Sequence, residues 1–168
     1  MILVRGAFLS MLLMSVGGAV LTLFLPQTGC VLAGTLAVYL TLTSWMAVRR
    51  KYSVGYGDLF ALLVALCVVA SGVEVGLTGS GTNAVSAFVL AGIATVAAAG
   101  DLRLLIQGGI RPRSRLLRHL WRLGAALLIA TGSFATINGS AFVFLMELAL
   151  LTSLIFWIIH LQASLSTR

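Results

Sequence analysis

The sequence predicts an all-α integral membrane protein, built as one bundle of about six transmembrane helices. Of 168 residues, 60% are hydrophobic and only 9% are charged, whereas about a quarter of the residues in a soluble domain are charged. The mean hydropathy is +1.11, and apolar runs of bilayer-spanning length follow one another almost without interruption. The basic residues gather in the gaps between these runs, as they do in membrane proteins.

Each apolar run is close to the roughly 20 residues that a helix needs to cross about 30 Å of hydrocarbon. Glycine and proline separate the runs, since both residues end helices, and we expect Asp58 and Ser114 to act as N-caps. The predicted spans form a single transmembrane domain of residues 1–168, and they are 2–25, 30–48, 59–78, 84–107, 115–137 and 141–163.

The distribution of Lys and Arg predicts the orientation. Cytoplasmic loops carry an excess of these residues, and two loops concentrate them, whereas the turns at 26–29, 79–83 and 138–140 have none. We therefore expect both termini on the cytoplasmic side, and the net charge of +7 to reflect orientation rather than nucleic-acid binding. The residues expected to contact anionic lipid headgroups or a partner protein are Arg49, Arg50, Lys51, Arg111, Arg113, Arg115 and Arg118.

A group of charged residues lies near the cytoplasmic ends of the fourth and fifth spans. At about 1.5 Å of rise per residue, Asp101 is level with His119 and Arg122. His119 and Arg122 are three residues apart and share a helix face, and Arg103 follows Asp101 by two residues. Because a charge inside a bilayer finds a partner or marks a pathway, these four residues form a candidate polar cluster. The structural alternative is that Arg122 snorkels or pairs with Asp101 to fix the hairpin.

Sequence motifs around this cluster resemble a family of uncharacterised bacterial multipass membrane proteins. The motifs are Gly100-Asp101-Leu102-Arg103, then Gly108-Gly109, then Arg118-His119-Leu120-Trp121-Arg122, and the segment Tyr39 to Arg50 is also similar. The resemblance covers about residues 35–165, and it implies a bacterial inner-membrane protein with no assigned activity. Glu74 and the string from Ser53 to Asp58 depart from the family pattern.

Two carboxylates, Glu74 in the third span and Glu147 in the sixth, lie at similar depths near the outer ends of their helices. A carboxylate inside the bilayer is costly and by default faces the bundle interior, where it can carry protons or cations. At this shallow depth, a neutral or snorkelling side chain is the alternative.

Small residues predict close packing between the third and fourth spans, because helices in lipid associate through close backbone contact. Gly72 and Gly76 form a GxxxG pair, and the facing stripe is expected to be Ala91, Thr95 and Ala99.

The outer turns also show a short internal similarity, since Thr78-Gly79-Ser80 resembles Thr131-Gly132-Ser133. Either a tandem-hairpin origin or ordinary turn chemistry explains it.

Two histidines and one glycine-rich string are the candidates for a cofactor site or a pore. His119 and His160 are the only histidines and both fall at cytoplasmic helix ends, so they are the haem candidates, although no Cys-x-x-Cys-His motif accompanies them. We expect no metal site and no resident cofactor. The string from Ser53 to Asp58 resembles a potassium-channel selectivity filter, but basic residues precede it and the charge distribution places it on the cytoplasmic side. A glycine-rich turn capped by Asp58 is the alternative.

The sequence therefore favours a non-catalytic membrane protein. It shows no nucleophile with a base, no phosphate-binding glycine loop and no carboxylate pair with acid/base spacing. We prefer an accessory or structural subunit of a membrane complex, because the middle of the spans is nearly bare of polar residues. The alternatives are a small proton- or cation-coupled transporter, a haem-binding redox protein and, last, a potassium-channel-like pore.

Overall fold

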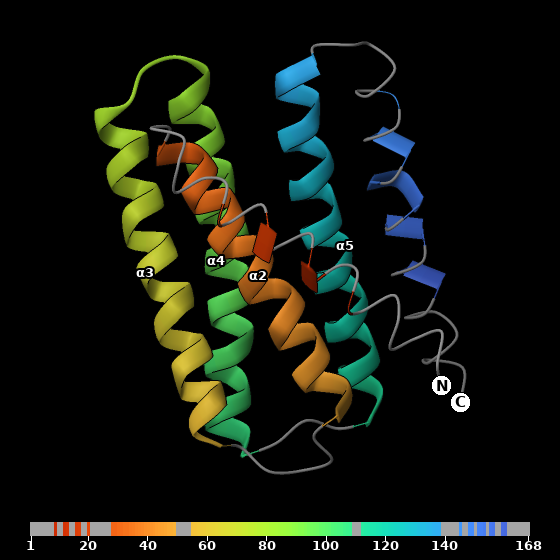
Figure 1. Ribbon diagram of the computed structural model, residues 1–168. Helices are drawn as coiled ribbons and strands as arrows, with labels where there is room; N and C mark the ends of the chain where they lie inside the picture. The colour runs from red at the N-terminus through yellow and green to blue at the C-terminus, as the bar shows by residue number, and fades with distance from the viewer. Residues whose placement is uncertain are drawn as a thin grey trace.

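The computed structural model describes residues 28–49, 55–108 and 112–138, together with single positions between residues 9 and 20 and between 145 and 160. Every element within these residues is an α-helix, as predicted (Figure 1). The continuous helices are α2 (Thr28–Arg49), α3 (Tyr56–Thr78), α4 (Thr82–Gln107) and α5 (Pro112–Asn138). They correspond to the second to fifth predicted spans, while the first and sixth, 2–25 and 141–163, lie mostly outside the described residues.

Three of these helices are long and apolar enough to cross a membrane: α3, α4 and the segment Cys30–Val48 of α2. This confirms the prediction of transmembrane-type helices. α5 is 27 residues long, but its first half contains four arginines, so its continuous apolar stretch is shorter.

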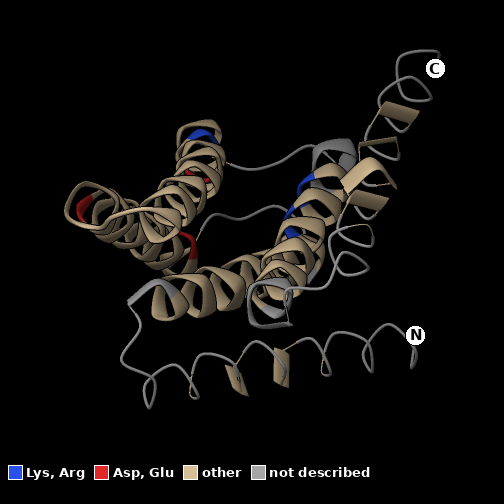
Figure 2. Cartoon of the chain, turned by 90° about the horizontal axis from the view of Figure 1, so that it is seen from above, with Lys and Arg blue, Asp and Glu red and all other residues tan. Residues whose placement is uncertain are grey.

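The outer surface of the helices is mostly apolar. Leu77, Val85 and Ile106 are 74%, 64% and 77% exposed, and few charged residues interrupt the described ribbon (Figure 2). Many hydroxyl groups donate to a carbonyl oxygen four residues earlier in their own helix, which satisfies them where no water is at hand. The side chains that do so include Thr35, Thr41, Thr78, Thr95 and Thr131.

α3 begins three residues earlier than predicted. Gly55 is the N-cap, and Asp58, which we expected in that place, lies in the first turn instead. The Asp58 carboxylate accepts a hydrogen bond from the Gly55 N–H at 2.9 Å, and the Asp58 N–H donates to the Gly55 carbonyl oxygen at 2.9 Å. The carboxylate thus satisfies a backbone donor that precedes the helix, as in the second half of a capping box.

α5 also begins three residues earlier than predicted, at Pro112 rather than at residue 115. Proline suits the first helical position because its missing N–H would have no partner there, so Ser114 is a residue of the first turn and not the N-cap. Gly108, which ends α4, has φ +65°, a left-handed conformation that glycine adopts without strain.

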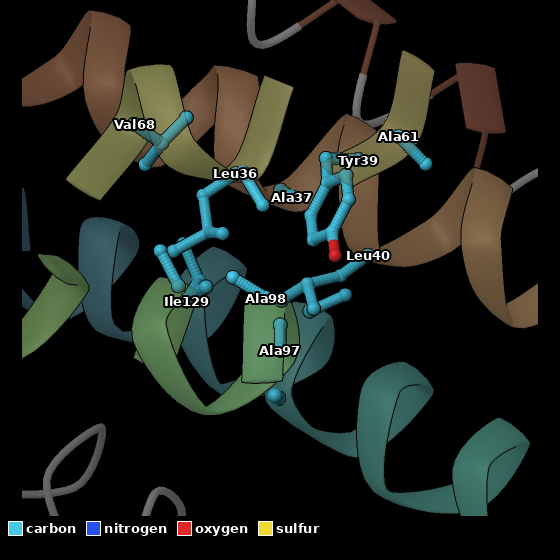
Figure 3. Close-up of a cluster of buried hydrophobic side chains, with 13 residues drawn as sticks. Leu36, Ala37, Tyr39, Leu40, Ala61, Val68, Ala97, Ala98 and Ile129 are labelled. Atoms are coloured by element: carbon cyan, nitrogen blue, oxygen red, sulfur yellow. The ribbon is translucent and has the colours of Figure 1, made fainter. Parts of the chain in front are cut away.

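α2 crosses the middle of the bundle and joins two helix pairs (Figure 1). α3 packs against α4, whereas α2 packs against α5 and also contacts α3 and α4. Apolar side chains from all four helices meet in one core, which includes Leu36, Leu40, Val68, Ala97 and Ile129 (Figure 3). The ring of Tyr39 stands in the same core, so a polar hydroxyl enters an otherwise apolar interior.

Glycine and alanine form the contact between α3 and α4, as predicted. A Cβ atom added to Gly72 would lie 3.0 Å from the Ala91 Cβ, so the two helix backbones approach as closely as small residues allow. The expected stripe on α4 is correct only at Ala91, because Thr95 and Ala99 are exposed. The buried face of α4 runs instead through Ala87, Ala91, Ala94, Ala97 and Ala98.

Within the described residues, the two Thr-Gly-Ser segments of the internal similarity have different structures. Gly79 ends α3 and its N–H donates to the Val75 carbonyl oxygen at 2.8 Å. Gly132, its counterpart in the sequence, lies within α5, which continues to Asn138. Ordinary turn chemistry is therefore the better explanation of the first segment.

Candidate functional site: a buried carboxylate held by three helices

Asp101 accepts hydrogen bonds from side chains of two other helices. Its Oδ1 accepts from the Nη2 groups of Arg118 and Arg122, the latter at 2.7 Å. Its Oδ2 accepts from the hydroxyl of Tyr39. Tyr39 belongs to α2 and the two arginines belong to α5, so one carboxylate of α4 connects three helices. We call Tyr39, Asp101, Arg118 and Arg122 the Asp101 cluster.

The Asp101 cluster is closed to solvent. Asp101 is 1% exposed and Arg122 is 0% exposed, while the side chain of Arg118 is 12% exposed. A charge can be buried in this way only when opposite charges and hydrogen bonds compensate its lost hydration. The carboxylate meets that condition, because both of its oxygens have a donor.

Arg122 makes two further contacts that fix its orientation. Its Nη2 also donates to the carbonyl oxygen of Ala97 at 3.0 Å, and its guanidinium carbon lies 5.5 Å from the centre of the Tyr39 ring. The second contact is of the cation–π type. Arg122 therefore touches α4 through a carboxylate and a carbonyl, and α2 through an aromatic face.

Helical periodicity brings these side chains together. Arg118 and Arg122 are four residues apart and project from the same face of α5. Asp101 continues the buried face of α4 that passes through Ala94 and Ala97. At about 1.5 Å per residue, Asp101 lies roughly 9 Å before the end of α4 at Gln107, and Arg118 the same distance after the start of α5 at Pro112. The cluster is thus inside the bundle and not at its rim.

A second polar contact lies beside the cluster and joins α2 to α5. The Oγ of Ser44 lies 2.6 Å from Nδ1 of His119 and donates to the His119 carbonyl oxygen at 3.1 Å. The same Nδ1 lies 3.1 Å from the Ser44 carbonyl oxygen. Ser44 is fully buried, so the pair packs as part of the helix contact.

Of the four residues of the predicted cluster, the structure brings Asp101 and Arg122 into direct contact as an ion pair. His119 lies on the same helix as Arg122, but its described contacts are to Ser44 of α2. Arg103 is exposed and is not part of the cluster. Because α4 turns by about 100° per residue, a side chain two residues after Asp101 points to the opposite side of the helix.

Arg118 was predicted to contact lipid headgroups or a partner protein, but its described contact is inside the bundle. It pairs with Asp101, since the early start of α5 moves it deeper into the bundle. The sequence prediction missed Tyr39 and Ser44. Their spacing of five residues on α2 gave no signal that they meet α4 and α5, which lie far away in the chain.

The remaining basic residues that we expected at the membrane surface, Arg49, Arg50, Lys51, Arg111, Arg113 and Arg115, have side chains outside the described part of the structure. Their contact with headgroups or a partner stays a prediction.

Of the two predicted carboxylates, the described residues contain only Glu74. Its side chain is exposed on α3, on a different face from the buried Gly72 and Gly76. Glu74 therefore points away from the core of the described helices, and the alternative of a neutral or snorkelling side chain stays a prediction. Glu147 lies outside the described residues, so its depth relative to Glu74 stays a prediction.

The described contacts of the two haem candidates are to protein groups. His119 directs Nδ1 toward Ser44, and His160 is exposed with its ring centre 6.0 Å from that of Phe156. Among the residues that the structure describes, no group of three or more His, Cys, Asp or Glu side chains is placed to hold a metal ion.

The segment that resembles a potassium-channel filter is described from Gly55 onward, and it is helical from Tyr56. Tyr56, Gly57 and Asp58 form the first turn of α3, and Tyr56 is 94% exposed. A filter lines its pore with carbonyl oxygens, whereas the carbonyls of a helical turn point along the helix toward later N–H groups.

No protein-family model, curated protein sequence or solved structure matches this chain. The resemblance to bacterial multipass membrane proteins therefore stays a prediction from the motifs alone.

Proposed function

We propose that this protein is a non-catalytic, multi-pass membrane protein that acts as an accessory or structural subunit of a larger membrane complex. In this proposal the chain crosses a bacterial inner membrane six times, with both termini in the cytoplasm. The three apolar helices and the basic segments between the spans support this arrangement.

The observation that carries the proposal is a row of polar side chains on the outside of α3. Glu74 is exposed, although α3 has a mean hydropathy of 2.3, higher than the other two candidate spans. Cys67, Ser71 and Thr78 are exposed as well. These four residues follow one another at intervals of four, three and four, so they share one helix face. We call them the α3 polar stripe.

A polar stripe that faces hydrocarbon is unfavourable, and a neighbouring helix with matching donors relieves the cost. Figure 1 shows α3 at an edge of the bundle, where another helix has room to pack. The carboxyl group of Glu74 favours a neighbouring helix that offers a positive charge or a hydrogen-bond donor. We therefore assign the stripe to a transmembrane helix of another subunit that carries a Lys, an Arg or an amide donor in its outer third.

The interior of the protein supports a structural role. Asp101 is 1% exposed, and both of its oxygens are engaged by donors from α2 and α5. A carboxylate that carries protons or cations has to exchange its partners during each cycle. Asp101 instead holds three helices in a fixed arrangement, which suits a subunit that supplies a stable surface.

Native Cys67 offers a direct test, because it lies on the stripe and is exposed. In a Cys30→Ala background, Cys67 is the single cysteine, and a thiol-reactive photo-crosslinking reagent, which links to any nearby side chain, applied to native membranes should join it to the partner. Mass spectrometry of the linked peptide should find a transmembrane segment with a basic or amide side chain near its outer end.

Substitutions of Glu74 then test whether the stripe makes the contact. Without cross-linking, Glu74→Gln should reduce the amount of the identified partner that co-purifies. Glu74→Leu should reduce it further, by about tenfold or more, because a buried charge pair is lost. Val96→Gln is the matched control, since Val96 is 61% exposed on α4 and the change adds the same amide to a different outer face. The control should retain the partner.

Two outcomes would overturn the proposal. A linked product of twice the 17.6 kDa mass of the chain would identify a second copy as the occupant. Retention of the partner in Glu74→Leu, or its loss in Val96→Gln, would show that the stripe does not select it.

A further inference from the structure

The guanidinium groups of the Asp101 cluster have more N–H donors than the cluster has acceptors. Among the residues that the structure describes, Nε and Nη1 of Arg122 and Nε of Arg118 are buried and find no hydrogen-bond partner. Arg122 is 0% exposed, so bulk water does not compensate these groups. A buried charged donor without an acceptor is rare in native proteins, because the lost hydration is not replaced.

Charge is unbalanced in the same place. Two guanidinium groups contact one carboxylate, which leaves one positive charge in excess among the groups in direct contact. Asp58 exerts a further, weaker attraction on Arg118, but its Oδ2 is bound to the Gly55 N–H at 2.9 Å. In the sequence, the segments 49–51 and 111–115, which follow α2 and flank the start of α5, add six basic residues. Clustered charge of one sign raises the local concentration of counter-ions.

We propose that Arg118 and Arg122 form a binding site for a small anion at the Asp101 end of the bundle. The anion accepts hydrogen bonds from the free N–H groups of the two side chains and neutralises the excess charge. Its chemistry is that of a compact N–H acceptor, either a free halide or phosphate ion or the phosphate of an anionic lipid headgroup. Charge-assisted hydrogen bonds of this kind are among the strongest that proteins make.

The site is independent of the α3 polar stripe. The stripe lies on α3 and extends toward the end of that helix at Thr78, whereas Arg118 and Arg122 belong to α5. The role proposed for the anion is to complete the contact between α4 and α5. The protein should therefore be more stable when the anion is present, because a ligand that binds only the folded state shifts unfolding by mass action.

The test measures thermal unfolding of the purified full chain in a neutral detergent. Sodium gluconate, which serves as the reference salt without halide or phosphate, is replaced stepwise by sodium chloride at constant ionic strength. We expect the unfolding midpoint of the unmodified protein to rise by about 2–4 °C and then to saturate. A general salt effect depends on ionic strength alone, so it would leave the unfolding midpoint unchanged during this exchange.

Three variants give different expected responses. Arg122→Gln leaves one guanidinium beside one carboxylate, so the rise with chloride should disappear. Asp101→Asn leaves two guanidinium groups without a carboxylate, so the rise should be larger and should begin at lower chloride. Arg103→Gln removes an exposed positive charge from the same helix as Asp101, and it should respond like the unmodified protein.

A measurement on the unmodified protein covers the case in which a variant fails to fold. In crystals grown with bromide, an anomalous scattering peak should lie within hydrogen-bond distance of Nε or Nη1 of Arg122. If phosphatidylglycerol, but not phosphatidylcholine, removes the chloride response while raising the midpoint, the anion is a lipid phosphate. Equal midpoints in gluconate and chloride without added lipid, or a response that survives Arg122→Gln, would overturn the proposal.

Discussion

Oδ1 of Asp101 lies 2.7 Å from Nη2 of Arg122, and this ion pair connects α4 to α5. These helices are consecutive in the chain, but α4 packs mainly against α3 and α5 mainly against α2. The ion pair therefore joins the α3–α4 pair to the α2–α5 pair. Because the contact is buried, its contribution should be large when one partner is removed, even though the intact pair adds little net stability over an apolar contact.

The first prediction concerns removal of the buried carboxylate charge. Asp101→Asn should lower the free energy of unfolding by about 3–5 kcal/mol, since two guanidinium groups lose their counter-charge inside the bundle. Unfolding by sodium dodecyl sulfate, followed by circular dichroism in the absence of chloride, measures the change. Arg103→Gln is the control, because Arg103 is exposed, and it should stay within about 0.5 kcal/mol. Equal losses in the two variants would contradict the described geometry.

The second prediction isolates the Tyr39 hydroxyl. Tyr39→Phe keeps the ring against Arg122 and removes only the hydrogen bond to Asp101. The loss should be about 1.5–3 kcal/mol, the range for a hydrogen bond to a charged group. Tyr56→Phe is the same chemical change at a residue that is 94% exposed, so it should have no measurable effect. In combination with Asp101→Asn, the Tyr39→Phe loss should shrink, because the charged acceptor is already absent.

The third prediction ranks three glycine-to-alanine changes by the space around each residue. Gly72→Ala should cost the most, about 1–3 kcal/mol, because the new methyl meets the Ala91 Cβ at 3.0 Å and the Ala87 carbonyl oxygen at 3.2 Å. Gly76→Ala meets only the Phe88 ring, which is 45% exposed and can move aside.

Gly92→Ala is the control for this series. Nothing lies within 4 Å of its added methyl group, and alanine favours a helix over glycine by up to about 1 kcal/mol. It should therefore be neutral or stabilising. The same unfolding assay gives the order, and a Gly92→Ala variant less stable than Gly72→Ala would contradict the packing of α3 against α4.

The fourth prediction concerns topology. Reporter domains fused after residue 52 or residue 110 should be active only as cytoplasmic reporters, and a fusion after residue 80 should be active only in the periplasm. Residue 52 falls between α2 and α3, residue 80 between α3 and α4, and residue 110 between α4 and α5. Periplasmic activity at residue 52 would reverse the proposed orientation, although the helix contacts would remain as described.

Much of the helical architecture could be predicted from sequence because it depends on local patterns. The four described helices agree with the predicted spans to within three residues, and the two larger errors fall at the starts of α3 and α5. In both places the helix begins before the apolar run, at Tyr56 after the N-cap Gly55 in α3 and at Pro112 in α5. Hydropathy does not register such polar first turns, whereas capping chemistry does.

The site was only partly predictable, because it depends on which helices are neighbours. Asp101 and Arg122 could be paired by counting residues from a shared turn. Tyr39 could not, since it lies 62 residues before Asp101 and an aromatic residue in an apolar helix usually indicates core packing. Arg118 was misplaced for a local reason, because three more residues at the start of α5 put it almost one turn deeper.

Translation begins at the amino end, so Tyr39 and Asp101 are synthesised before either arginine. While α5 is still within the ribosome, the Tyr39 hydroxyl is the one donor of the Asp101 cluster that has already been synthesised. The guanidinium groups arrive afterwards and complete the set of donors. The order of the residues along the chain thus sets an order of assembly, in which α5 supplies the positive charges only after Asp101 of α4 has been made.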